Sequence, residues 1–165
     1  MTSRIVLFAA LLILPIGLLG YVAYDATRTG GIRQTDTGFK VSLKEMSTFP
    51  FDQQAGTVDD VPQRFRELDG QTVILIGQMW APDQIRGPVP DFELVYSIVD
   101  CCFVGEPQIQ HFVQADVPDD MEVRLYGQGD FIEVIGTLRV EVEHDESGRI
   151  IGVYHLDVHG VQKVS

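Results

Sequence analysis

The stretch FIEVIGTLRVEVEHDESGRIIGVYHLDV, residues 131–158, decides the fold. Its first half, residues 131–143, alternates between apolar and polar side chains, which is the period of a β-strand with one buried face. The residues DESGR at 145–149 are typical of a hairpin loop, and residues 150–158 return as a second strand. The sequence therefore predicts an antiparallel hairpin whose long first strand curves at Gly136.

The register of this hairpin follows from the requirement that both apolar sets face inward. Because side chains alternate with a period of two, a slip by one residue would expose one set to water. The consistent register has three inward pairs: Leu138 with Leu156, Val140 with Tyr154, and Val142 with Gly152. The opposite face of the returning strand carries His155, Asp157 and His159, and we expect that face to be solvated.

The segments before the hairpin predict further short strands and one helix. Strands are expected at residues 39–43, 72–80, 92–99 and 108–114, and residues 72–80 (TVILIGQMW) are apolar enough to be buried on both faces. Residues 61–68 favour a short helix with Pro62 at its start. This mainly-β pattern predicts a small OB-like barrel, and a β-sandwich is the alternative.

The amino-terminal segment has the composition of a membrane anchor. Residues 5–24 (IVLFAALLILPIGLLGYVAY) carry no charge, and twenty helical residues span the hydrocarbon core of a bilayer. We expect an anchor at residues 1–24, a polar tether at 25–38 and the β domain at 39–165. A cleaved signal peptide is the alternative, but the small-x-small site that it requires is poor here. The layout is that of a signal-anchor, which predicts a single-pass protein of the cell membrane with its domain outside the cytoplasm.

The charge of the chain excludes one class of partner. The net charge is −12, and Arg4 is the only charged residue in the anchor, so the acidity belongs to the β domain. An acidic field repels phosphate backbones. We therefore expect no nucleic-acid partner.

Cys101, Cys102 and His111 are the candidate metal ligands. The two cysteines are adjacent and are the only ones in the chain, so they cannot staple distant segments together. If residues 103–107 connect two antiparallel strands, Cys101 and His111 share a face. Two thiolates and one imidazole suit Cu(I) or zinc. However, adjacent strand residues point to opposite faces, and three ligands do not complete a tetrahedral zinc site.

Two other interpretations of the cysteine pair stay open. Cysteine packs well inside proteins, so the pair is also explained as small buried side chains at the end of a strand. Thiol redox chemistry is the other, although an oxidoreductase would favour a Cys-x-x-Cys motif, which is missing. His111 lies between Ile109 and Val113 in the strand pattern, which is also consistent with a hydrogen-bonded core histidine.

Several segments resemble a family of exported bacterial domains of unknown function. They are LDGQTVILIGQMWAP (68–82), DFELVYSIVDCCFVGEP (91–107), VIGTLRVE (134–141) and GVYHLDVHGV (152–161). The Cys-Cys-Phe segment is the most specific of them. The resemblance implies a compact OB-like domain that is exported and often tethered to the membrane, and it supplies no catalytic residues to carry over.

Together these features predict a membrane-tethered, extracytoplasmic binding or accessory module with a candidate soft-metal site. The alternative is a structural or protein-interaction domain of an envelope or transport complex, with a buried cysteine pair. The motifs of serine hydrolases, phosphate-binding loops and zinc proteases are missing from the sequence, so a binding module is favoured over an enzyme.

Overall fold

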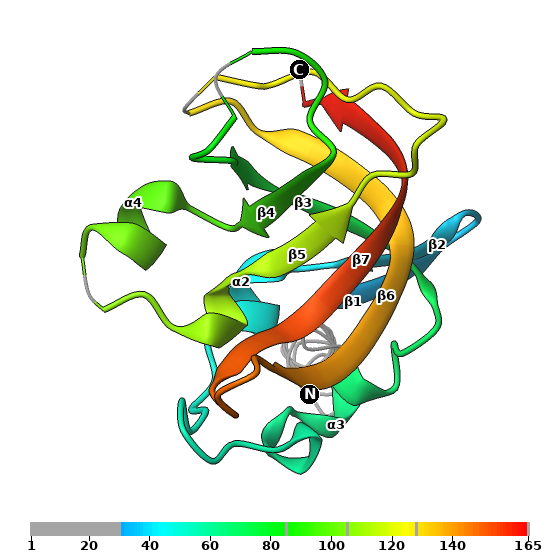
Figure 1. The fold of residues 1–165 in the computed structure, drawn as a ribbon. Helices are drawn as coiled ribbons and strands as arrows, with labels where there is room; N and C mark the ends of the chain where they lie inside the picture. The colour runs from blue at the N-terminus through cyan, green and yellow to red at the C-terminus, as the bar shows by residue number, and fades with distance from the viewer. Residues whose placement is uncertain (1–30, 85, 105, 128, 165) are drawn as a thin grey trace, which may run out of the picture. The chain divides into compact units, whose positions relative to one another are not determined.

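Seven strands form one sheet in the part of the chain that the structure, a computed structural model, describes: residues 31–84, 86–104, 106–127 and 129–164. Figure 1 shows the strands, short helices and connecting loops. The elements in chain order are β1 (Ile32–Thr35), β2 (Gly38–Val41), α2 (Leu43–Ser47), η1 (Val58–Asp60), α3 (Gln63–Arg66), β3 (Thr72–Trp80), β4 (Asp91–Val95), α4 (Ile98–Cys102), η2 (Ile109–His111), β5 (Val113–Asp116), β6 (Ile132–His144) and β7 (Ile150–Lys163).

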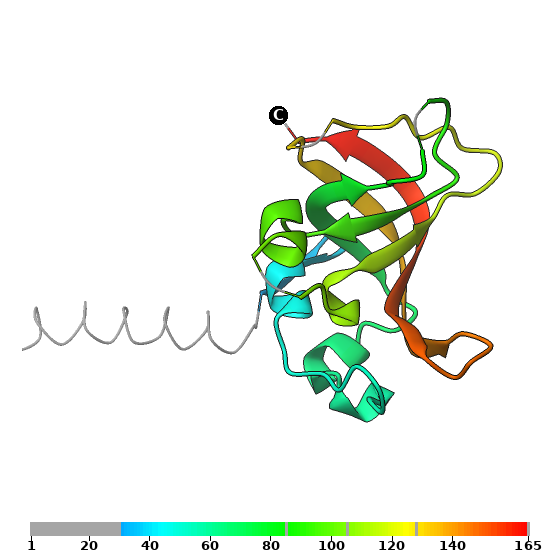
Figure 2. The same cartoon turned by 60° about the vertical axis from the view of Figure 1, so that its left-hand side comes forward.

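The sheet turns back on itself through β3. Its order is β1-β2-β3-β4-β5-β7-β6, and β3 also pairs with β6. Residues 72–77 of β3 pair with β6, whereas residues 78–80 pair with β4. The strands from β3 to β7 therefore form a partly closed ring, which the two views in Figures 1 and 2 show curving around the core. The fold is mainly β, as predicted.

The β6–β7 hairpin has the predicted register over its central part. Leu138 pairs with Leu156 and Val140 pairs with Tyr154. The prediction for Val142 is wrong, because Glu143 rather than Val142 faces Gly152. One extra β6 residue lies between these pairs, and such a bulge lets a long strand bend.

Gly136 marks the second irregularity of the hairpin, and it lies where the curve was predicted. The register shifts between Ile135 and Gly136. A Cβ atom at Gly136 would lie 2.5 Å from the carbonyl oxygen of Asp157 and 2.8 Å from Cγ of Leu156. The close approach of β7 therefore requires a residue without a side chain at this position.

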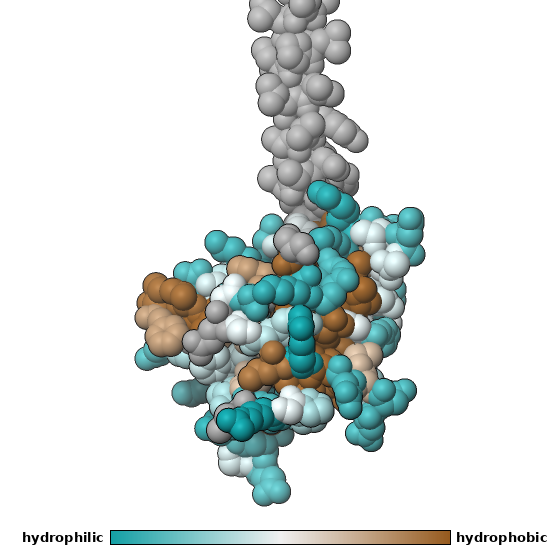
Figure 3. Space-filling view, turned by 90° about the horizontal axis from the view of Figure 1, so that it is seen from above, coloured by the Kyte–Doolittle hydropathy of each residue, from teal (hydrophilic) through white to brown (hydrophobic). Residues whose placement is uncertain are grey.

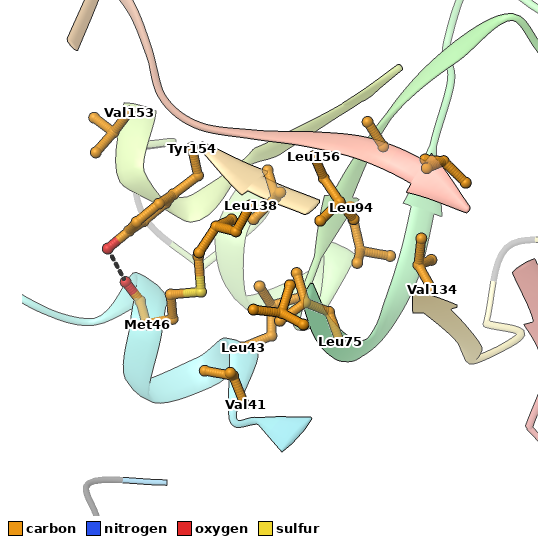
Figure 4. Close-up of a cluster of buried hydrophobic side chains, with 14 of the residues drawn as sticks. Val41, Leu43, Met46, Leu75, Leu94, Val134, Leu138, Val153, Tyr154 and Leu156 are labelled. Carbon is orange, nitrogen blue, oxygen red and sulfur yellow. Dashed lines mark hydrogen bonds between the residues drawn. The ribbon is translucent and has the colours of Figure 1, made fainter. Parts of the chain in front are cut away.

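The main core lies inside the partly closed ring. Figure 4 shows side chains from α2 meeting those of β3, β4, β6 and β7. The hydroxyl of Tyr154 donates a hydrogen bond to the carbonyl oxygen of Met46 at 3.1 Å, so the buried phenol is satisfied and attaches α2 to β7. Buried residues of this core include Leu43, Met46, Val73, Leu75, Leu94, Val134, Leu138, Val153, Tyr154 and Leu156.

Several predicted boundaries differ from those observed. Strand β1 lies within residues 25–38, the segment that we predicted as a tether, and pairs with β2. The predicted helix at 61–68 is present as α3, with Pro62 as its N-cap. The predicted anchor, residues 1–24, lies outside the described residues. In the described part, no helix is long and apolar enough to cross a bilayer.

Candidate functional site

Cys101 and Cys102 lie in a helix, not at the end of a strand. The strand predicted for residues 92–99 ends at Val95, and α4 follows at Ile98–Cys102. The hydroxyl of Ser97 accepts a hydrogen bond from the backbone N–H of Asp100 at 3.2 Å, which is an N-cap. The side-chain oxygen of Gln78 accepts from the N–H of Ile98 at 2.8 Å. These two bonds satisfy donors at the start of α4 and turn the chain out of the sheet.

A small second core surrounds Cys101. The side chain of Cys101 is fully buried with Val95 and Ile98, and Trp80 and Phe112 pack against this cluster. Its Sγ atom lies 3.7 Å from the carbonyl oxygen of Ile98, within range of a weak S–H hydrogen bond. Cys101 therefore helps to hold α4 against the outer face of β3 and β4.

His111 lies in η2, so the predicted strand at 108–114 is also wrong in its first half. Strand β5 begins only at Val113. The buried amide of Gln110 donates to the carbonyl oxygen of Phe49 at 3.0 Å and accepts from Gln53 at 3.0 Å. These contacts, together with a bond from the N–H of Ile109 to Gln53, attach η2 to residues 49–53 and replace the expected strand pairing.

Tyr96 lies beside both Cys101 and His111. Its ring is 6.4 Å from the imidazole of His111 in an edge-on arrangement. The pKa of Tyr96 is raised by burial and by the nearby side chains of Asp100 and Cys101. Burial lowers the pKa of His111, which favours the neutral imidazole, and its Nδ1 atom is buried without a hydrogen-bond partner in the described chain.

The three predicted metal ligands are only partly described. Cys101 and His111 neighbour the same tyrosine, but the side chain of Cys102 is outside the described atoms. Among the side chains that are described, no three from His, Cys, Asp and Glu are placed to hold a metal ion. The soft-metal site therefore stays a prediction.

The outer end of α4 is strongly apolar. Val99 is 60% exposed, Phe103 is 75% exposed and Val104 is 74% exposed. In Figure 3, brown surface projects on the left, the side on which α4 lies in Figure 1. Exposed apolar side chains that gather on one surface are typical of contact surfaces.

A cleft of about 410 Å³ lies on the outer face of β4 and β5. This volume is within the usual range for small-molecule sites. The cleft borders the α4 region, because Trp80 contributes both to its wall and to the small core around Cys101. The wall comes from three segments that are distant in sequence. They are residues 80–84, residues 90–93 and residues 114–116.

The cleft lies between a row of paired strand residues and a loop that is closed by hydrogen bonds. Trp80 pairs with Glu93 across β3 and β4, and Glu93 pairs with Gln114 across β4 and β5. The amide of Gln84 donates to the carbonyl oxygens of Arg86 at 3.1 Å and Pro88 at 2.8 Å. These bonds close the loop after β3 and hold its first residues at the edge of the cleft.

Four carboxyl groups line the cleft, and no lysine or arginine is among its lining residues. Burial raises the pKa of Glu93 above its ordinary value. Asp116 lies 3.4 Å from Arg139. The other three, Asp83, Asp91 and Glu93, have no hydrogen-bond or ion-pair partner within the described residues.

The row of strand partners from Trp80 to Gln114 continues to His155, which we predicted on the solvated face. His155 pairs with Gln114 and with Arg139, so it lies on the predicted outer face, yet it is only 5% exposed. The amide of Gln114 crosses to β7 and donates to the carbonyl oxygen of Ile151 at 2.9 Å. Both this amide and the His155 ring lie close to Gly152 of β7, so the Gln114 side chain from β5 lies beside the ring.

Sequence reasoning found one component of the cleft and missed the others. Trp80 ends the predicted strand 72–80, and it lines the cleft. Glu93 lies in the predicted strand 92–99, and its sequence neighbours carry no signal that sets it apart. The burial of the Glu93 carboxyl depends on β5 and on the loop after β3. A local sequence pattern does not reveal that these segments lie beside it.

The fold and the site together define a mainly-β domain with an acidic, tryptophan-walled cleft on the outer face of its sheet. A crystal structure of a DUF3299 family protein from Pseudomonas aeruginosa PAO1 is similar to this chain, with 24% sequence identity and a TM-score of 0.47. The match covers 61% of this chain and 65% of that one, so this chain spans less than two thirds of that protein. No family model and no curated protein matches the chain.

Proposed function

We propose that this chain is a membrane-tethered binding module of OB-like fold, which binds its ligand in the cleft on β4 and β5 outside the cytoplasm. The observation that carries the binding function is the cleft itself, whose lining includes four carboxyl groups and Trp80, the strand partner of Glu93. Polar groups left without partners in a concave site are the usual basis of ligand recognition. The partner that such a module serves would be an envelope or transport protein.

The membrane part of the proposal rests on the uncharged segment at residues 5–24. When the full chain is expressed in a bacterium, it should stay in the membrane fraction after an alkaline carbonate wash. Protease added to spheroplasts should digest the β domain. Leu12→Arg with Ile16→Arg places two charges in the span and should release the chain from the membrane. A mature protein that begins near residue 25, or a domain protected from the protease, would contradict the tether.

The binding part can be measured through Trp80, which is the sole tryptophan of the chain. The full chain in phosphatidylcholine nanodiscs is titrated with small probes of three charge types: a diamine, a diol and a dicarboxylate. Saturable change in tryptophan emission with any one of them supports a binding cleft. If none of the three changes the emission up to high millimolar concentration, the cleft is not a ligand site.

A second proposal retains the soft-metal site at Cys101, Cys102 and His111. It is supported by the position of Tyr96 beside both Cys101 and His111, and by the burial that favours the neutral, metal-binding form of the imidazole. The full chain under reducing conditions should take up zinc or Cu(I), and uptake should fall with pH because the ligands must lose their protons.

Three variants test that second proposal. Cys101→Ser, Cys102→Ser and His111→Ala should each lower the metal affinity, while His144→Ala at the end of β6 should leave it unchanged. A wild-type chain that takes up neither metal at micromolar concentration would end the metal proposal. It would leave the binding cleft untouched, since Cys101 and His111 are not among the residues that line it.

A further inference from the structure

The cleft on β4 and β5 has the chemistry of a site for a positively charged group. Its described wall holds four carboxyl groups and no lysine or arginine. The carboxyl of Glu93 is half-buried, and within the described residues it forms no ion pair with a lysine or arginine. An anionic group in such a place is stabilised by an opposite charge that enters the cleft.

The nearest arginine in the row cannot supply that charge. Arg139 lies 2.9 Å from Glu141, 3.1 Å from Asp157 and 3.4 Å from Asp116, and these carboxylates raise its pKa. Its guanidinium is therefore engaged by these three carboxylates. The cleft stays anionic around Glu93 because the local arginine is already surrounded by acids.

The spacing of the carboxyl groups selects the kind of cation. No three described carboxyl, thiol or imidazole groups are placed to hold a metal ion, so the cleft does not present the converging oxygens that a bare divalent ion needs. Trp80, which pairs with Glu93 in the sheet, adds an aromatic wall. Aromatic faces attract ammonium and guanidinium groups, most strongly when the group is partly desolvated.

We propose that this cleft binds an organic cation, an alkylammonium or guanidinium group, between the indole of Trp80 and the carboxylate of Glu93. The inference rests on the proposed binding function and names the ligand class. Such a cationic group can belong to a free amine, or to a lysine or arginine side chain of a partner protein. A straight alkyl chain with a terminal ammonium suits a site that combines apolar wall and carboxylate.

The test uses the full chain in phosphatidylcholine nanodiscs, followed by calorimetry and by Trp80 emission. Cadaverine is titrated beside two probes of similar length, the neutral 1,5-pentanediol and the dianion glutarate. A lysine peptide with blocked ends represents a partner's side chain, and empty nanodiscs give the blank. We expect saturable binding of cadaverine or of the lysine peptide, weakened by added salt, and no binding of pentanediol or glutarate.

Variants identify the groups responsible. Glu93→Gln keeps the shape and removes the charge, and it should weaken cadaverine binding about tenfold or more. Glu146→Gln removes one exposed carboxyl at the tip of the β6–β7 hairpin and should leave binding unchanged. By calorimetry, Trp80→Phe should retain most of the affinity and Trp80→Leu should lose several-fold, because only the first keeps an aromatic face.

The outcomes separate this inference from the function on which it rests. Tighter binding of cadaverine identifies a free amine, and tighter binding of the peptide identifies a partner's side chain. Binding of pentanediol or glutarate without cadaverine would overturn the cation and keep the binding cleft. Equal loss of affinity in Glu93→Gln and Glu146→Gln would also overturn it, since general acidity would then explain the binding. If no probe binds, both proposals fail.

Discussion

The β6–β7 hairpin and the segment from β4 to β5 show two ways in which this sequence determines structure. The hairpin is long, and apolar residues alternate with polar ones over many positions. Many inward pairs therefore favour the same register, and one exceptional pair does not change it. The described residues of 91–104 and 106–116 form two short strands, a short helix and a 3-10 turn. Here single contacts decide the path, such as the Ser97 cap of α4 and the Gln110 contacts of η2.

The hairpin and the β4–β5 segment also contribute differently to the candidate site. The hairpin contributes Leu138 and Leu156 to the main core. The β4–β5 segment supplies the exposed apolar end of α4 and much of the wall of the cleft. The outward residues of β4 and β5 line the cleft, while inward residues such as Leu94 and Val113 belong to the main core.

The largest effect should follow from truncating the hairpin core. Leu138→Ala removes a fully buried side chain, and we expect a loss of about 2–5 kcal/mol in the free energy of unfolding. Urea unfolding of the full chain, monitored by circular dichroism, measures the loss. Ile151→Ala, at an exposed position of β7, is the matched control and should change stability by about 0.5 kcal/mol or less. Equal losses in the two variants would refute the assigned register.

Truncation of the small core under α4 should cost less and act locally. Ile98→Ala is expected to lower stability by about 2 kcal/mol, at the low end for this substitution, because α4 can settle over the gap. Hydrogen exchange should become faster in α4 while β6 and β7 keep their protection. If the exchange of β6 and β7 rises equally, the two regions are one cooperative unit and the comparison fails.

The cap of α4 should have a smaller effect again. Ser97→Ala removes the acceptor for the N–H of Asp100, and such a loss costs about 1 kcal/mol. Exchange of the amides at the start of α4 reports it. Ser97→Asp offers another side-chain oxygen to the same donor and should restore most of the protection. Unchanged exchange in Ser97→Ala would mean that the cap does not hold α4.

The smallest effect concerns the tip of the hairpin and depends on pH. Hydrogen bonds from the Ser147 hydroxyl and from the backbone of Arg149 hold the pKa of Asp145 at about 2. Because this value lies below the ordinary pKa of about 3.9, the carboxylate stabilises the loop above pH 4 and loses this effect as pH falls towards 2. Asp145→Asn should flatten that part of the stability–pH curve. The wild type and the variant would show the same curve if the loop contacts contribute nothing.

The hairpin could be predicted from the sequence because its information is periodic. The pairs Leu138 with Leu156 and Val140 with Tyr154 follow from parity alone. The same parity failed beyond Val140, where a bulge inserts one β6 residue and brings Glu143 opposite Gly152. A bulge is a tertiary adjustment to the curvature of the sheet, and a regular alternation of residue types does not reveal it.

The candidate site was harder to predict because its residues meet only in the fold. Residues 92–99 alternate like a strand, but the bond from the N–H of Ile98 to Gln78 requires a residue twenty positions earlier. Three separate segments line the cleft, and the burial that raises the pKa of Glu93 arises only in the folded sheet. Trp80 alone gave a local signal, as an aromatic residue at the end of an apolar strand beside prolines.

The location of bound cation tests the central claim most directly. Amide chemical shifts of the full chain in nanodiscs are recorded with increasing cadaverine, with pentanediol as the control. The account predicts that the shifts concentrate at residues 80–84, 90–93 and 114–116 and saturate together with the calorimetric signal. Shifts that are spread over the acidic surface without saturation, or confined to the α4 end at residues 99–104, would contradict it.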